Sequence, residues 1–286
     1  MTTGKSIAIH RADQRFALDL GWRSTLTLVL VSTVGVLAFC WPLIMGAGSI
    51  LQQTALTPLL LALVLVLVLV VGLVTLGDGQ IDSKSLAMLG VLAAVGAILR
   101  PLSAGSAGIE LVFLFLYFGG RVFGAGFGFA LGSVTIFVSA LLTGGLGPWL
   151  PYQMLAASWI GLGAGLLPKK TRGWRETTML SAYAAISGFL YGQLMNLSFW
   201  PFTLGLDTGL SFQAGAPLWQ NLSRFAIFSV FSSLGWDLLR AAVLSTLVAL
   251  LSPTILSALR RTSRRAVYGE RDNRNVRSSK NSNEIH

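Results

Sequence analysis

The chain has 286 residues, of which 53% are hydrophobic and only 11% are charged, and its formal net charge is +10. Soluble domains carry roughly 25% charged residues, so this composition excludes an ordinary soluble enzyme and predicts an integral membrane protein. The basic residues gather before residue 24 and after residue 259, where they are expected to anchor helices to the lipid bilayer, and we expect no nucleic-acid partner.

Apolar runs of spanning length predict eight transmembrane helices. In chain order they cover residues 24–45, 57–76, 85–99, 109–120, 124–143, 152–167, 177–199 and 222–256. The third and fourth runs are short for a span, which is tolerated where a helix ends inside a protein-lined cavity. The first run follows basic residues as a signal peptide does, but its length and the lack of a cleavage pattern predict a retained helix.

The distribution of basic residues predicts a multi-pass protein of the plasma membrane with both termini in the cytoplasm. With the N-terminus inside, all but three of the 21 basic residues fall on the cytoplasmic side. The exceptions are Arg100, Arg224 and Arg240. An even number of spanning helices follows from this asymmetry.

Composition divides the chain into four segments. A basic N-terminal segment, residues 1–23, precedes a Leu/Val-rich pair of helices in residues 24–77, which has the composition of lipid-facing helices. The six-helix core, residues 83–259, is richer in glycine, alanine, serine and aromatic residues, which is typical of close helix packing and of cavities. The basic tail, residues 260–286, is predicted to be a disordered cytoplasmic segment.

Four ionisable residues lie within or beside the predicted core helices. Arg100 and Glu110 flank the short turn between the third and fourth spans. Because a charge near hydrocarbon is costly unless it is paired or hydrated, both are candidates for function, with interfacial anchoring as the alternative. Asp237 and Arg240 are three residues apart in the last helix, so we expect a structural ion pair, with a gating role as the alternative.

Three loops on the predicted outer side are unlike the others. Residues 100–108 are rich in serine, glycine and alanine, whereas residues 143–151 and 200–221 carry aromatic residues and few charges. Aromatic faces and amides on one side of a bundle suit a ring-containing organic ligand, whereas an aromatic belt at the membrane interface explains the tryptophans equally well. Gln193 and Asn196, near the outer end of the seventh span, can bind such a ligand or join two helices. The predicted substrate-binding residues are Arg100, Glu110, Trp149, Tyr152, Gln193, Asn196, Trp200 and Trp219.

Patterns for catalysis, metal binding and cofactor binding are missing from the sequence. The two histidines lie in the polar ends of the chain, and the single cysteine, Cys40, cannot form an internal disulfide. Neither a phosphate-binding glycine loop followed by Lys-Ser/Thr nor a pair of carboxylates is present. We therefore expect no catalytic residue, no metal, no cofactor and no nucleotide hydrolysis by this chain.

Small residues recur at four-residue spacing along the predicted helices, and this spacing lets another helix approach closely. For three sets we predict packing inside the core, whereas Ala93 and Ala97 are predicted to dock a separate subunit. The three core sets are Gly124/Gly128/Gly132, Gly161/Gly165 and Gly188/Gly192, and Gly90/Ala94 follows the same spacing.

Several stretches of the core carry a family resemblance. They are Ala93-x-x-x-Ala97, Leu99-Arg100-Pro101-Leu102, Gly119-Gly120-Arg121-Val122-Phe123-Gly124 and Thr143-Gly144-Gly145-Leu146-Gly147-Pro148-Trp149. Through them the core resembles the substrate-binding S-component of energy-coupling factor (ECF) vitamin transporters. The helix pair in residues 24–77 departs from the six-helix pattern of that family.

The resemblance implies a vitamin-binding subunit whose pocket lies at the outer side. It also implies that the Ala93/Ala97 face docks a transmembrane coupling subunit, which joins two cytoplasmic ATPases, and that the protein topples in the bilayer to release its cargo. The large, aromatic, nearly neutral outer loop suggests a cobalamin-type corrinoid as substrate, with riboflavin or another B vitamin as the alternative. An ion-coupled secondary carrier and a membrane assembly or scaffold protein remain as alternative functions.

Overall fold

The computed structural model describes residues 21–44, 57–77, 83–103, 109–203 and 208–283, and within these ranges it contains helices and no strands. The predicted all-α class is thereby confirmed. In chain order the helices are α2 (Trp22–Phe39), α3 (Trp41–Ile44), α5 (Thr57–Gly77), α6 (Ser83–Ser103), α7 (Val112–Phe123), α8 (Ala125–Thr143), α9 (Leu150–Leu166), α10 (Trp174–Thr203), α11 (Leu218–Ser232) and α12 (Leu234–Asn283).

Several of these helices have the length and apolar composition needed to cross a membrane. Within the described ranges, four helical segments are both long enough and apolar enough: α2, α6, α8 and the Leu234–Ser263 part of α12. Helices α5 and α7 hold shorter apolar stretches. These helices support a multi-pass membrane protein. The count of eight spans stays a prediction.

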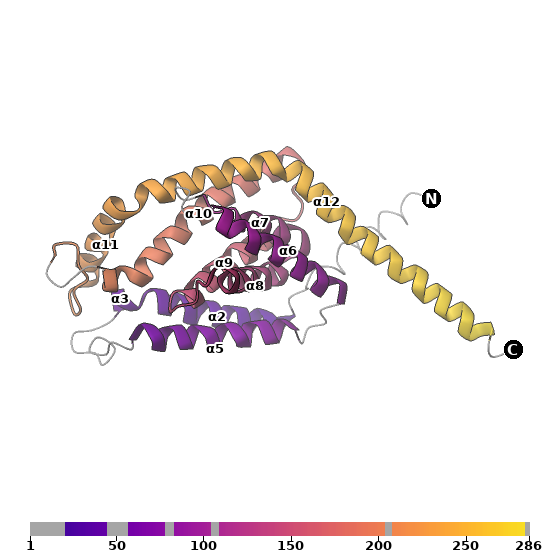
Figure 1. Cartoon of the computed structure of the whole chain (residues 1–286), viewed down its shortest axis with the longest axis horizontal. Coiled ribbons are helices and arrows are strands. Elements are labelled where there is room, and N and C mark those ends of the chain that lie inside the picture. Colours follow the sequence, from indigo (N-terminus) through magenta and orange to yellow (C-terminus); the bar gives the residue numbers. More distant parts are fainter. Residues whose placement is uncertain (1–20, 45–56, 78–82, 104–108, 204–207, 284–286) are drawn as a thin grey trace.

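The helices are arranged around α7, α8 and α9, which lie in the middle of the bundle (Figure 1). On one side α10 packs along α12, and on the other the N-terminal pair, α2 and α5, packs against α9 and α8. Helix α6 packs mainly on α8. The N-terminal pair therefore covers one side of the core and leaves α6 at its edge.

Glycines let α7, α8 and α9 touch backbone to backbone at the centre of the bundle. A Cβ atom added at Gly128 or at Gly161 would overlap the carbonyl oxygen of the other residue, and one at Gly120 would meet the Gly161 carbonyl. Gly132 and Gly165 lie just as close to the backbone of the facing helix. The prediction that these glycines pack inside the core is confirmed.

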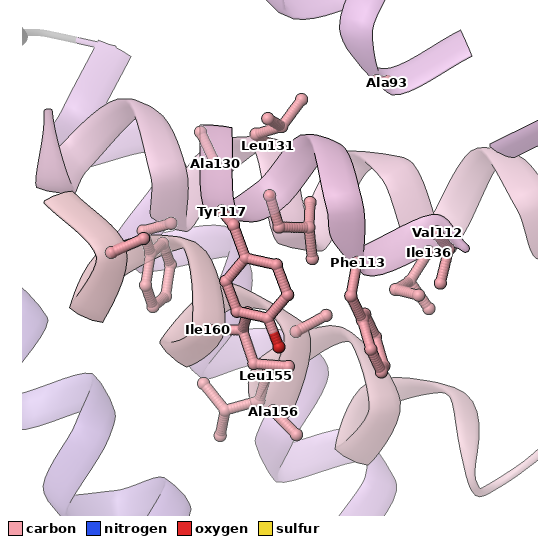
Figure 2. Packing of buried hydrophobic residues seen from close by; sticks show 14 of the residues in the cluster. Ala93, Val112, Phe113, Tyr117, Ala130, Leu131, Ile136, Leu155, Ala156 and Ile160 are labelled. Carbon is pink, nitrogen blue, oxygen red and sulfur yellow. The ribbon is translucent and has the colours of Figure 1, made fainter. Parts of the chain in front are cut away.

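Large apolar side chains fill the space around this contact. Phe113 and Tyr117 project from α7 toward Leu155 and Ile160 of α9, and all four are buried (Figure 2). The Tyr117 hydroxyl lies 3.0 Å from the Ser187 hydroxyl of α10, which gives this buried polar group a partner. Aromatic packing thus joins α7 to both α9 and α10.

The last predicted span, residues 222–256, is divided in the structure. Helix α11 ends at Ser232 and α12 begins at Leu234, because Ser233 adopts a non-helical backbone conformation with φ of −140°. The continuous apolar run gave no indication of this break. At the same point the Ser233 hydroxyl donates a hydrogen bond to the Asp237 carboxylate.

The tail also differs from its prediction, since α12 continues to Asn283 through the segment expected to be disordered (Figure 1). The tail is continuous with a long apolar helix, so no new helix nucleus has to form. It also contains several arginines, which favour helix, and no proline. The composition of the tail predicted disorder because it contains no information about the helix that precedes the tail.

Candidate functional site

A group of polar side chains lies between α7, α10 and α12, with Arg240 at its centre. The Arg240 guanidinium donates from Nε to Glu110 Oε1 at 2.8 Å and from Nη1 to Asp237 Oδ1 at 2.5 Å. It also lies over the ring of Tyr191, 5.8 Å from the ring centroid. Arg240 therefore joins the segment that precedes α7 to α12 and α10.

The second carboxylate, Asp237, is held from three sides. Its Oδ2 atom accepts hydrogen bonds from Gln193 Nε2 and from Ser233 Oγ, both at 2.8 Å, and Asn196 donates to the Ser233 hydroxyl. We call these residues the polar cluster: Glu110, Gln193, Asn196, Ser233, Asp237 and Arg240.

Close packing of α10 on α12 makes the polar cluster possible. A Cβ atom at Gly192 would overlap the Asp237 carboxylate and crowd Arg240, and one at Gly188 would press on Leu244. The prediction that Gly188 and Gly192 pack inside the core is confirmed. Since residues three or four apart share a helix face, Gln193 and Asn196 both turn toward α12.

The polar cluster lies beside the N-terminal end of the short helix α7. Helix α7 has 12 residues. It is therefore about 18 Å long, shorter than the hydrocarbon core of about 30 Å. Arg121, at the other end of α7, is held among the loop carbonyls of Leu167 and Pro168.

Glu110 and Asp237 carry two negative charges and Arg240 carries one positive charge, so the three groups together keep a net negative charge. Arg100 lies close enough to attract the Glu110 carboxylate. Arg100 also donates from Nη2 to Gln153 Oε1 on α9 at 2.8 Å. The side chains of Asp237 and Glu110 are 2% and 28% exposed, so Glu110 is the more exposed of the two carboxylates. This internal pairing favours a functional role for Glu110 over interfacial anchoring.

The predicted aromatic residues divide into buried and exposed pairs. Trp200 is buried among the rings of Phe212, Phe225 and Phe228, and its indole donates to the Leu210 carbonyl at 2.8 Å. Tyr152 is buried against the rings of Phe39 and Phe199.

In contrast, the Trp149 and Trp219 side chains are 41% and 68% exposed. The structure does not bring these two tryptophans into the polar cluster. Their exposure agrees better with an interfacial aromatic belt than with a shared pocket.

The predicted docking residues, Ala93 and Ala97, are buried in the structure, at 1% and 0% exposure. They face the inside of the bundle, where α6 packs on α8 and where Gly96 lies against the Thr135 side chain. A partner subunit cannot reach them in this arrangement, so the prediction has to be corrected. The neighbouring pair, Gly90 and Ala94, is exposed on the opposite face of α6.

Sequence reasoning did not place Ser233, Tyr191 or Gln153 at a site. The pairing of Asp237 with Arg240 followed from their spacing and is confirmed, but nothing in that spacing indicated Glu110, 130 positions away. Among the described residues no three His, Cys, Asp or Glu side chains are grouped so that they could hold a metal ion.

Comparison with known proteins gives one match. A family model described as "ECF transporter, substrate-specific component" matches residues 84–252, from the first turn of α6 into α12. This range includes the whole polar cluster and leaves out the N-terminal helix pair and the basic tail. No curated protein and no solved structure matches the chain.

Proposed function

The chain belongs to the family of substrate-specific components of ECF transporters, and we propose that it captures a small organic molecule at the polar cluster for import. The observation that supports this proposal is the set of charged and amide side chains held together between α7, α10 and α12, in a chain whose apolar helices are expected to cross a membrane. Ionisable groups in that position are expensive and mark substrate pathways.

Within the polar cluster the residues divide into two roles. Asp237 and Arg240 are enclosed and bonded on several sides, so they position their neighbours. Glu110 is partly exposed and has one carboxylate oxygen, Oε2, besides the one that Arg240 holds, so we assign it the direct contact with substrate. Asn196 and Gln193 supply amides on the same side.

Aromatic neighbours favour a ring-containing substrate. Tyr191 and Phe113 lie edge to face beside the polar cluster, with ring centroids 4.7 Å apart, and Trp200 lies further along α10. We propose a vitamin, with a cobalamin-type corrinoid as the first candidate and riboflavin or another B vitamin as the second. Mass spectrometry of the ligand carried through purification in mild detergent identifies it.

Glu110→Gln is expected to weaken binding of that ligand about tenfold or more, because a charge-assisted hydrogen bond contributes about 1.5–3 kcal/mol. The fold should survive, since Arg240 keeps its bond to Asp237. The measurement is calorimetric titration of the purified chain, with the unfolding midpoint recorded for each variant.

Glu270→Gln is the matched control, because Glu270 lies beyond the Leu234–Ser263 span of α12. A folded Glu110→Gln protein that binds within twofold of the unchanged chain contradicts the proposed role of Glu110. Ion-driven uptake by proteoliposomes that contain this chain alone would instead favour a secondary carrier, whose coupling groups would be the same ionisable residues.

For delivery, we propose that the chain docks onto an ECF transmembrane coupling subunit with two ATPases, with both of its own termini in the cytoplasm. The basic flanks support this orientation. The exposed face of α6, which includes Gly90, Ala94 and Ile98, is the proposed docking surface. It lies within the family match, is free of charges, and is not covered by the N-terminal pair.

Ala94→Trp is expected to prevent co-purification with the coupling subunit and to abolish uptake, while substrate affinity stays unchanged. A large side chain on this face holds the two helices apart, because small residues permit close contact in membranes. Pull-down of the coupling subunit and uptake by cells measure the effect. Val29→Trp, on the exposed face of α2, is the control for added bulk. Unchanged complex formation by Ala94→Trp would place the docking surface elsewhere.

A further inference from the structure

A second charged group lies at the end of the bundle where α7 and α9 finish and α10 begins. Glu176 Oε1 accepts hydrogen bonds from Arg121 Nε and Arg260 Nη2, each at 2.6 Å, and Arg172 lies 3.8 Å away. Lys169 belongs to the same group. The group therefore contains one carboxylate and four basic side chains.

The carboxylate of this group stays ionised. Burial by itself would raise the pKa of Glu176, but hydrogen bonds from Arg260 and Arg121 outweigh burial and lower the pKa below its ordinary value. Arg121 is also bonded to the backbone, since it donates hydrogen bonds to the carbonyls of Leu167 at 2.9 Å and Pro168 at 3.0 Å. Arg121 and Glu176 are thus fixed by bonds within the protein, and the charged group as a whole keeps a net positive charge.

The surplus charge surrounds a small cavity of about 90 Å³, whose walls include Arg121, Lys169, Arg172 and Arg260. Four of the side chains around this cavity are cationic, so it suits an anionic group. Arginine and lysine side chains are the usual ligands of phosphate oxygens. The charge of the lining therefore favours a phosphate group.

A larger, mainly apolar cavity of about 510 Å³ adjoins the first between the start of α10 and α12. Trp174, Pro253 and Leu256 line it together with Glu176, and Arg260 borders both cavities. A free phosphate ion has no apolar part that could fill an apolar groove, whereas a phospholipid carries acyl chains next to its phosphate. The two cavities together therefore favour a lipid.

We propose that this pair of cavities binds an anionic phospholipid, with its phosphate among Lys169, Arg172 and Arg260 and an acyl chain along α12. Basic pockets between membrane helices are known to hold anionic lipid headgroups. The bound lipid ties the loop between α9 and α10 to α12, and it does so whatever substrate the polar cluster takes.

The test uses the full chain purified in detergent, titrated with phosphatidylglycerol, phosphatidylcholine or inorganic phosphate, with the unfolding midpoint and native mass spectrometry as readouts. Phosphatidylglycerol is expected to bind in preference to phosphatidylcholine. The double variant Lys169→Gln/Arg172→Gln is expected to bind phosphatidylglycerol about thirtyfold more weakly, since each basic residue near an anionic lipid contributes about 1 kcal/mol. Both residues are exposed, so the fold does not depend on them.

Lys170→Gln/Arg261→Gln removes the same charge from exposed positions next to the cavity that do not line it, and it should bind phosphatidylglycerol normally. Equal loss in both double variants overturns the proposal in favour of diffuse attraction. Absence of preference between the two lipids overturns it as well. Stabilisation by inorganic phosphate without any lipid preference assigns the site to free phosphate and overturns the lipid assignment.

Discussion

Gly161→Val is expected to abolish the accumulation of folded protein. The added side chain would run into the carbonyl oxygen of Gly128, and backbone atoms cannot move aside as a flexible side chain can. Helices α7, α8 and α9 would have to separate along their whole contact. Overpacking a core costs about 1–3 kcal/mol when side chains can adjust. We expect a larger loss here, out of a total stability of about 5–15 kcal/mol.

The measurement is the yield of monodisperse protein after size-exclusion chromatography, together with the unfolding midpoint. Gly90→Val makes the same chemical change at a helical glycine where a Cβ meets nothing within 4 Å, and it should fold like the unchanged chain. Equal yields and midpoints for the two variants would show that the central glycine contact does not hold the bundle together.

Arg240→Gln is expected to be the most damaging single change at the polar cluster. It leaves the carboxylates of Glu110 and Asp237 inside the helix bundle without their shared counter-charge. Removing one partner of a buried ion pair costs about 3–5 kcal/mol, because the remaining charge is uncompensated. We expect a lower unfolding midpoint and loss of substrate binding, both measured on purified protein.

A charge-balanced variant separates folding from recognition. In Glu110→Gln/Asp237→Asn/Arg240→Gln the three charges are removed together while amides keep hydrogen-bonding capacity, so much of the lost stability should return. Substrate binding should not return, because the Glu110 carboxylate is missing. An Arg240→Gln protein as stable as the unchanged chain would mean that water, rather than Arg240, compensates these carboxylates.

Local patterns were enough to predict most helices of the core, although not the division of its last span into α11 and α12. The apolar run of residues 124–143 corresponds to α8 (Ala125–Thr143), since crossing hydrocarbon demands a continuous apolar segment with its backbone hydrogen bonds satisfied internally. The glycine spacing of Gly161 and Gly165 likewise predicted close packing, because four residues return a helix to the same face. The family resemblance, carried by local motifs, is confirmed by the match to residues 84–252.

Tertiary structure alone decided which side of α6 is free and which charges meet. Two small-residue faces run along α6, and only its packing on α8 turns Ala93 and Ala97 inward and leaves Ala94 outside. Glu110 and Arg240 are far apart in the chain, so no local spacing relates them until α7 and α12 are brought together. A sequence records the period of each helix, whereas the rotation of a helix about its axis and its partners are set by packing.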